Sequence, residues 1–182
     1  MSDSIQTPTQ TDTTYLSDDD FETIRAKMPI VYIDAVPVRI DSLGQVTHVG
    51  LLLRMRHDGT ISRTVVSGRV LFRERVRDAL IRHLEKDLGP MAFPRLPTDP
   101  APFTVIEYFQ DPEISGFHDP RQHAVSLAYV VPVDGDCQPT QEALDLVWFT
   151  PQEAVSERVK REMTGGHDRL VRLALAHSGQ LP

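Results

Sequence analysis

One amphipathic helix set among short apolar segments constrains the fold of this chain more than any other feature. Residues Arg75–Leu88 repeat an apolar side chain every four positions, from Val76 through Leu80 and Leu84 to Leu88. Segments rich in valine and isoleucine come before and after this helix, and such segments favour strands. A helix with one apolar stripe must bury that stripe against another layer. The pattern therefore predicts an α/β domain, of the α+β kind, in which helices pack on a sheet.

The segments around this helix predict one mixed sheet sandwiched by helices. Pro37 lies inside the first of them and indicates an edge strand or a bulge, because proline cannot donate a hydrogen bond to a neighbouring strand. The stretch His57–Thr60 is typical of a hairpin turn. The expected strands are Ile30–Ile40, Val46–Met55, Ile61–Val66, Phe103–Phe109, His123–Val133 and Ala143–Phe149.

Helix-start signals mark the two ends of the domain. Ser17, with Asp20 three residues on, predicts the start of a short helix that ends before Pro29. The sequence Thr-Pro-Gln-Glu at 150–153 combines a cap, a proline at the first helical position and a capping-box glutamate. A final helix is expected at about 167–177. Residues 1–15 are polar and are predicted to be a disordered tail, which leaves 16–182 as a single domain.

Bulk properties exclude several classes of protein. The formal net charge is −7, and a broad nucleic-acid or anionic-membrane surface needs clustered positive charge instead. The single cysteine, Cys137, excludes a disulfide framework or a cysteine-rich zinc site within the chain. The N-terminal stretch has neither a basic region nor an apolar run, so a cytoplasmic location is the default expectation.

The segment Gly68–Gly89, GRVLFRERVRDALIRHLEKDLG, carries the spacing most informative about chemistry. Five residues separate Gly68 from Glu74, and seven more separate Glu74 from Arg82. This spacing resembles the Nudix box, and the order of strands and helices over residues 30–178 is similar to that of Nudix proteins. The resemblance implies a Nudix-type fold and hydrolysis of a nucleoside diphosphate linked to another group. It also implies a role for Mg²⁺ or Mn²⁺, since carboxylates in that box hold a divalent metal.

The box is degenerate at its metal-binding positions. The three carboxylate positions of the family hold His83, Lys86 and Asp87 here, so only one remains acidic. At about 4 Å and an effective dielectric near 20, the lysine ammonium repels each unit of metal charge by roughly 4 kcal/mol. If activity survives, the resemblance implies His83, Arg82 and Glu74 as catalytic residues, with Asp87 and Glu74 as metal ligands. Arg82 is also expected to brace the loop near Gly68.

A second polar cluster follows in the loop that enters the fifth expected strand. It contains His118, Asp119, Arg121 and His123. These side chains suit a clamp for substrate phosphate, to which Lys86 would contribute, or an acid/base group supplied from outside the box. The same residues around a proline are also typical of an ordinary surface turn.

Trp148 has two interpretations as well. It either stacks on a ligand base or, as we expect, packs against the C-terminal helices.

Two functional hypotheses of different classes follow. The first is a divalent-metal-dependent pyrophosphohydrolase with weak or lost activity. The second is an inactive Nudix-like module that binds a nucleotide or another diphosphate-containing molecule, or holds a partner, with Lys86, Arg82 and His83 replacing metal charge. The second needs no cofactor. Neither predicts a nucleic-acid or membrane partner, and a homodimer stays open.

Overall fold

The computed structural model describes residues 16–55, 59–139 and 143–182. The predicted N-terminal tail and part of the predicted turn at 57–60 lie outside these residues. Within them, six helices flank the strands of one sheet. The strands are β1 Ile30–Ile40, β2 Val46–Met55, β3 Ile61–Thr64, β4 Val66–Arg69, β5 Thr104–Tyr108, β6 Ala124–Pro132 and β7 Ala143–Phe149. The helices are α1 Asp18–Arg25, α2 Val76–Leu88, α3 Pro112–Ser115, α4 Pro151–Ala154, α5 Glu157–Arg161 and α6 His167–His177.

The sheet is mixed and branched. Its strands follow the order β3-β2-β1-β6-β5, with β4 also paired to β1 and β7 to β2. Only β1 and β6 run parallel among these pairs. The prediction of one strand over Ile61–Val66 is wrong, because the chain changes partner at the buried Val65. The residues before Val65 pair with β2, and those after it pair with β1.

Pro37 lies in the central strand of the sheet, so its prediction as an edge residue is wrong. One side of β1 pairs with β6 along its length, and the other side changes partner from β4 to β2. The last β4 pair is at Ala35 and the first β2 pair is at Val38. The carbonyl of Val38 accepts from Val133, on the β6 side, so the nitrogen of Pro37 points to the other side. Proline is tolerated there because the position falls between two partner strands.

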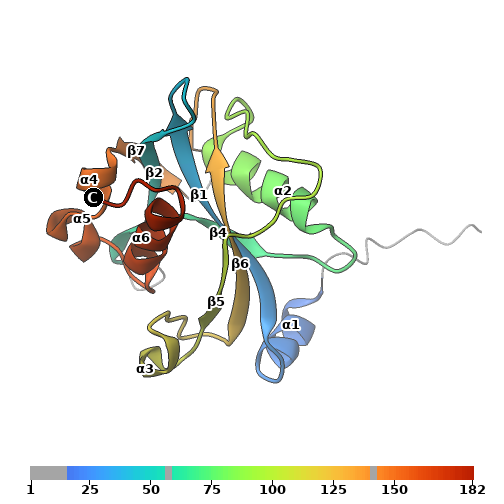
Figure 1. Ribbon diagram of the computed structural model, residues 1–182. Coiled ribbons are helices and arrows are strands. Elements are labelled where there is room, and N and C mark those ends of the chain that lie inside the picture. Colours follow the sequence, from blue (N-terminus) through green and yellow to red (C-terminus); the bar gives the residue numbers. More distant parts are fainter. Residues whose placement is uncertain (1–15, 56–58, 140–142) are drawn as a thin grey trace, which may run out of the picture.

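Helices cover both faces of the sheet, as the sequence predicted (Figure 1). Leu80, Leu84 and Leu88 of α2 are fully buried against strand residues such as Ile33 and Val66. The helices α4, α5 and α6 pack on the opposite side, where Leu170 is fully buried among residues of β1 and β2. None of the described helices has both the length and the hydropathy needed to cross a membrane.

The predicted helix starts are confirmed at atomic detail. The backbone N–H of Asp20 donates to Ser17 Oγ at 3.2 Å, and the Ser17 hydroxyl donates to the Asp20 carboxylate at 2.6 Å. Thr150 and Glu153 form the expected reciprocal capping box. The last helix occupies the residues expected for it.

The expected packing of Trp148 against the C-terminal helices is wrong. Its ring lies 4.4 Å below the guanidinium of Arg39, and Gly50 provides the space for it, since a Cβ there would lie 3.0 Å from the ring. Trp148 packs at the edge of the core beneath α2.

Candidate functional site

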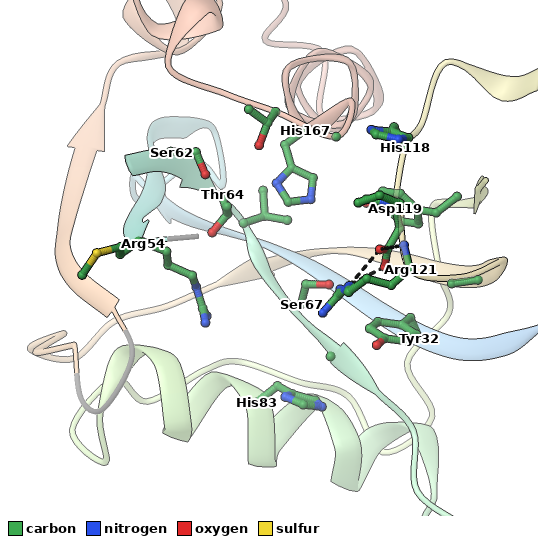
Figure 2. Close-up of a pocket in the computed structure, with 18 of the residues that line it drawn as sticks. Tyr32, Arg54, Ser62, Thr64, Ser67, His83, His118, Asp119, Arg121 and His167 are labelled. Atoms are coloured by element: carbon green, nitrogen blue, oxygen red, sulfur yellow. Dashed lines mark hydrogen bonds and ion pairs between the residues drawn. The ribbon is translucent and has the colours of Figure 1, made fainter. Parts of the chain in front are cut away.

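A cavity of about 580 Å³ opens between α2 and the start of α6. Strands β1 to β4 form its floor, and the loop from His118 to Arg121 forms one wall. Figure 2 shows His83 on α2 at one side of the cavity and His167, at the start of α6, on the opposite side. The polar lining residues are Tyr32, Arg54, Ser62, Thr64, Ser67, His83, Lys86, Tyr108, His118, Asp119, Arg121, Thr164 and His167.

His83 fills the space that a side chain at position 68 would need. A Cβ on Gly68 would lie 1.8 Å from His83 Cε1, so only glycine allows the imidazole to sit against β4. The ring nitrogen Nε2 lies 3.0 Å from the carbonyl of Arg69 and donates to it. Burial lowers the pKa of His83, the Arg69 hydrogen bond opposes this effect, and the charge of Arg82 adds to it. The imidazole therefore stays neutral at pH 7, with Nδ1 unprotonated.

Glu74 and Arg82 form a bidentate pair outside the cavity lining. Arg82 donates from Nε and Nη2 to the two carboxylate oxygens of Glu74, at 2.6 and 2.7 Å. Arg82 also donates to the carbonyl of Arg69 at 3.0 Å, and Glu74 accepts from the backbone N–H of Leu71 at 2.8 Å. Burial raises the pKa of Glu74, but the bonds from Arg82 and Leu71 outweigh it and lower the pKa overall. The expected bracing of the loop by Arg82 is thus present.

Asp87, the acidic residue left on the box face, is paired with a cation. Its Oδ2 lies 2.5 Å from Nη2 of Arg54, and its side chain is almost completely buried. Burial raises the pKa of Asp87, although the charge of Arg54 works against that rise. The ion pair ties α2 to β2.

The donors required for a divalent metal do not come together in the described part of the chain. Magnesium takes several oxygen ligands, usually including carboxylates. No group of three or more histidine, cysteine, aspartate or glutamate side chains among the described residues is arranged to hold a metal ion. Glu74 is engaged by Arg82, Asp87 is engaged by Arg54, and Lys86 lies on the wall of the cavity. This donor set does not fit the Mg²⁺ or Mn²⁺ cluster that the Nudix resemblance implies.

Three of the four predicted substrate-binding residues meet at the cavity, although they are distant in sequence. Lys86, His118 and Arg121 all line it, whereas His123 does not. The ring of His123 instead stacks on Phe109, with ring centroids 4.4 Å apart.

Arg121 is held by a neighbouring carboxylate. Its Nε and Nη2 each lie 2.9 Å from an oxygen of Asp119. Gln122 extends this network, because its Nε2 donates to Asp119 and to the hydroxyl of Tyr32, both at 2.9 Å. Burial raises the pKa of Asp119, but the hydrogen bonds from Arg121 outweigh it and lower that pKa.

The sequence did not predict a buried polar cluster of Asp34, Tyr108 and His167, on the side of the cavity opposite His83 (Figure 2). Tyr108 donates from its hydroxyl to Asp34 Oδ2 at 3.0 Å, and the rings of Tyr108 and His167 lie 6.3 Å apart. Burial raises the pKa of Tyr108, and the charge of Asp34 raises it further. Burial lowers the pKa of His167. The available signal was Asp34 itself, an acidic residue within the apolar run of β1.

The family described as "Domain of unknown function (DUF4916)" matches residues 11–180. The chain belongs to the DUF4916 family. No curated protein matches it.

The DUF4916 chain is also similar to solved structures. A protein from Jonesia denitrificans DSM 20603, named a possible asymmetric diadenosine tetraphosphate (Ap4A) hydrolase, is 58% identical to it. The alignment covers 86% of this chain and 98% of that one, with a TM-score of 0.84. A NUDIX hydrolase from Nitrosomonas europaea gives a TM-score of 0.58 at 14% identity, covering 84% and 90% of the two chains. The NUDIX domain of Shewanella oneidensis NrtR, solved with ADP ribose, gives a TM-score of 0.59 at 16% identity, and the alignment covers 88% of this chain and 98% of that one. The DUF4916 chain therefore has a Nudix fold.

Proposed function

We propose that this DUF4916 protein binds a nucleotide with two or more phosphates and holds the phosphates with its own cations rather than with a divalent metal. One observation carries the proposal. Of the described residues that line the cavity, Arg54, Lys86 and Arg121 are cationic and only Asp119 is acidic. Guanidinium and ammonium groups make charge-assisted hydrogen bonds to phosphate oxygens, which are stronger than neutral ones.

The size of the cavity supports a ligand larger than inorganic phosphate. Its volume of about 580 Å³ is within the roughly 300–1,000 Å³ range of small-molecule sites. Tyr32 and Tyr108 add aromatic surface to the lining. The name of the 58% identical Jonesia protein refers to a substrate with two nucleosides joined by four phosphates, which is a nucleotide of the proposed class.

Hydrolysis of such a nucleotide is the second candidate function, and the name of the same Jonesia protein favours it. In that case His83 is our candidate for the general base. Its Nδ1 is unprotonated at pH 7, because Nε2 donates to Arg69. The described residues that line the cavity would have to supply the remaining charge stabilisation.

Calorimetric titration with ADP tests the proposal. We expect binding in buffer that contains a chelator, and little gain in affinity when Mg²⁺ replaces the chelator. Arg121→Gln should weaken binding by about 1.5–3 kcal/mol, the value of a hydrogen bond to a charged group. The matched control is Arg95→Gln, since Arg95 forms a comparable pair with Asp134 away from the cavity.

Two results would overturn the binding proposal. The first is ADP binding only in the presence of Mg²⁺. The second is equal affinity of Arg121→Gln and Arg95→Gln for ADP. A parallel chromatographic assay with Ap4A tests the second candidate function, hydrolysis. Steady product formation that is lost in His83→Gln would favour a hydrolase.

A further inference from the structure

One wall of the cavity is polar but carries no formal cation. Ser62 and Thr64 project from the same face of β3, because residues two apart in a strand point to the same side. His167 lines the cavity from the start of α6. Figure 2 shows all three on the side of the cavity opposite His83. This wall, formed by Ser62, Thr64 and His167, is called the neutral wall below.

Backbone pairing brings the two parts of the neutral wall together. The N–H of Arg63 donates to the carbonyl of Glu162 at 2.7 Å, and Arg63 forms a parallel bridge with Met163. The chain that leads into α6 therefore runs beside β3. It then passes Gly165, whose carbonyl accepts from the N–H of His118, and reaches His167.

Each member of the neutral wall carries a buried polar atom without a protein partner among the described residues. These atoms are Ser62 Oγ, Thr64 Oγ1 and His167 Nδ1. Ser62 as a whole is only 2% exposed. Buried polar groups in native proteins are normally hydrogen-bonded, and leaving one unsatisfied costs stability. Three such atoms in the lining of one cavity point to a ligand that supplies the hydrogen bonds.

The charge around the neutral wall disfavours phosphate there. Asp34 is completely buried behind it and accepts a hydrogen bond from Tyr108, which also lines the cavity. Burial lowers the pKa of His167, with Asp34 opposing that shift, so the imidazole is neutral at pH 7. The nearest cation is Arg54, which lies opposite Ser62 in the β2–β3 pairing and is already paired with the carboxylate of Asp87. A phosphate group at this wall would therefore meet the buried Asp34 and an arginine whose charge is already compensated. An uncharged group with both donors and acceptors matches two hydroxyls and a neutral imidazole.

We propose that Ser62, Thr64 and His167 form a subsite for the base of the bound nucleotide. This inference rests on the proposed function and deepens it. The phosphates lie toward Lys86 and Arg121, and the base lies against the neutral wall. The protein thereby distinguishes a nucleotide from inorganic pyrophosphate, which carries the phosphates without a base.

Thr64→Val tests the subsite, because valine keeps the shape of threonine and removes only the hydroxyl. Thermal unfolding and calorimetric titration with ADP and with pyrophosphate are measured in chelator-containing buffer. We expect the variant to unfold at the same or a higher temperature, since an unsatisfied buried hydroxyl is gone. Its affinity for ADP should fall roughly threefold to tenfold, the loss of one neutral hydrogen bond, while its affinity for pyrophosphate stays unchanged.

Thr104→Val is the matched control, because Thr104 lies on β5 and does not line the cavity. Ser62→Ala is the second variant and should show the same selective loss for ADP if Thr64→Val does not fold. Equal ADP affinity in the wall variants and the control overturns the base subsite alone, provided that pyrophosphate still binds. Failure of both ADP and pyrophosphate to bind the unmodified protein overturns the subsite together with the proposed function.

Discussion

Arg54 of β2 and Asp87 of α2 form an ion pair at the cavity, with the guanidinium Nη2 2.5 Å from the carboxylate Oδ2. Asp87 is the acidic residue that remains on the box face, and its charge is compensated by the arginine. Arg54 also lines the cavity. The same contact therefore ties helix to sheet, and an arginine engages the carboxylate that the family resemblance assigns to a metal.

Removing one partner of this pair should destabilise the fold. Asp87→Asn removes the negative charge 2.5 Å from Arg54, in a site where the arginine side chain is only 19% exposed. Breaking a buried pair in this way costs about 3–5 kcal/mol, and we expect the low end because Arg54 reaches the cavity. The measurement is the free energy of unfolding in urea.

Asp99→Asn is the control for Asp87→Asn. Asp99 lies 3.7 Å from Arg75, and both side chains are largely exposed, so the loss should be within about 1 kcal/mol. Equal effects of the two substitutions would show that the Arg54–Asp87 pair does not stabilise the fold.

The contact between Gly68 and His83 predicts a strongly non-additive pair of substitutions. Gly68→Ala places a methyl group 1.8 Å from His83 Cε1, and this overpacking should destabilise the protein by roughly 1–3 kcal/mol. Adding His83→Ala removes the clashing ring. The double variant should then be more stable than the sum of the single effects predicts, by about 0.5–3 kcal/mol. Additive free energies of unfolding would mean that the two residues are not in contact.

Stability should rise with pH between about 5 and 7. Burial lowers the pKa of both His83 and His167 in the folded protein. In the unfolded chain each imidazole has its ordinary pKa of about 6.5, so the unfolded chain binds more protons than the folded protein in this pH range. The stability gained from keeping these two histidines neutral is therefore fully present above about pH 6.5 and is lost as the pH falls below it. The raised pKa of Asp87 acts in the opposite direction, but at lower pH. Urea midpoints measured across this range should show a shallower slope for His83→Gln, and an unchanged slope would exclude a buried neutral His83.

Local patterns predicted the elements that have one dominant signal. The leucine stripe of α2 identified the buried face. The Nudix resemblance, carried by the spacing of Gly68, Glu74 and Arg82, implied the brace beneath the loop. The short α3 was missed because four residues carry no periodicity, although its Asp111 cap and Pro112 are visible in the sequence.

Features that depend on the choice of partner strand could not be predicted. The run Ile61–Val66 has the same composition whether it pairs with β2, with β1 or with both, so the crossing at Val65 leaves no local trace. The Arg54–Asp87 pair and the neutral wall likewise join elements whose register is set only by the folded sheet.

Metal-independent phosphate binding is tested most directly by measuring ADP binding to Lys86→Ala in chelator-containing buffer. Lys86 lines the cavity at a position where the Nudix resemblance implies a metal-binding carboxylate. We expect the unmodified protein to bind ADP without metal and Lys86→Ala to bind it about 1.5–3 kcal/mol more weakly. Lys160→Ala, the control, removes an exposed lysine of α5 that pairs with Glu157 and should leave the affinity unchanged. ADP binding that requires Mg²⁺, with equal affinity in the two lysine variants, would show that the protein does not hold phosphate with its own cations.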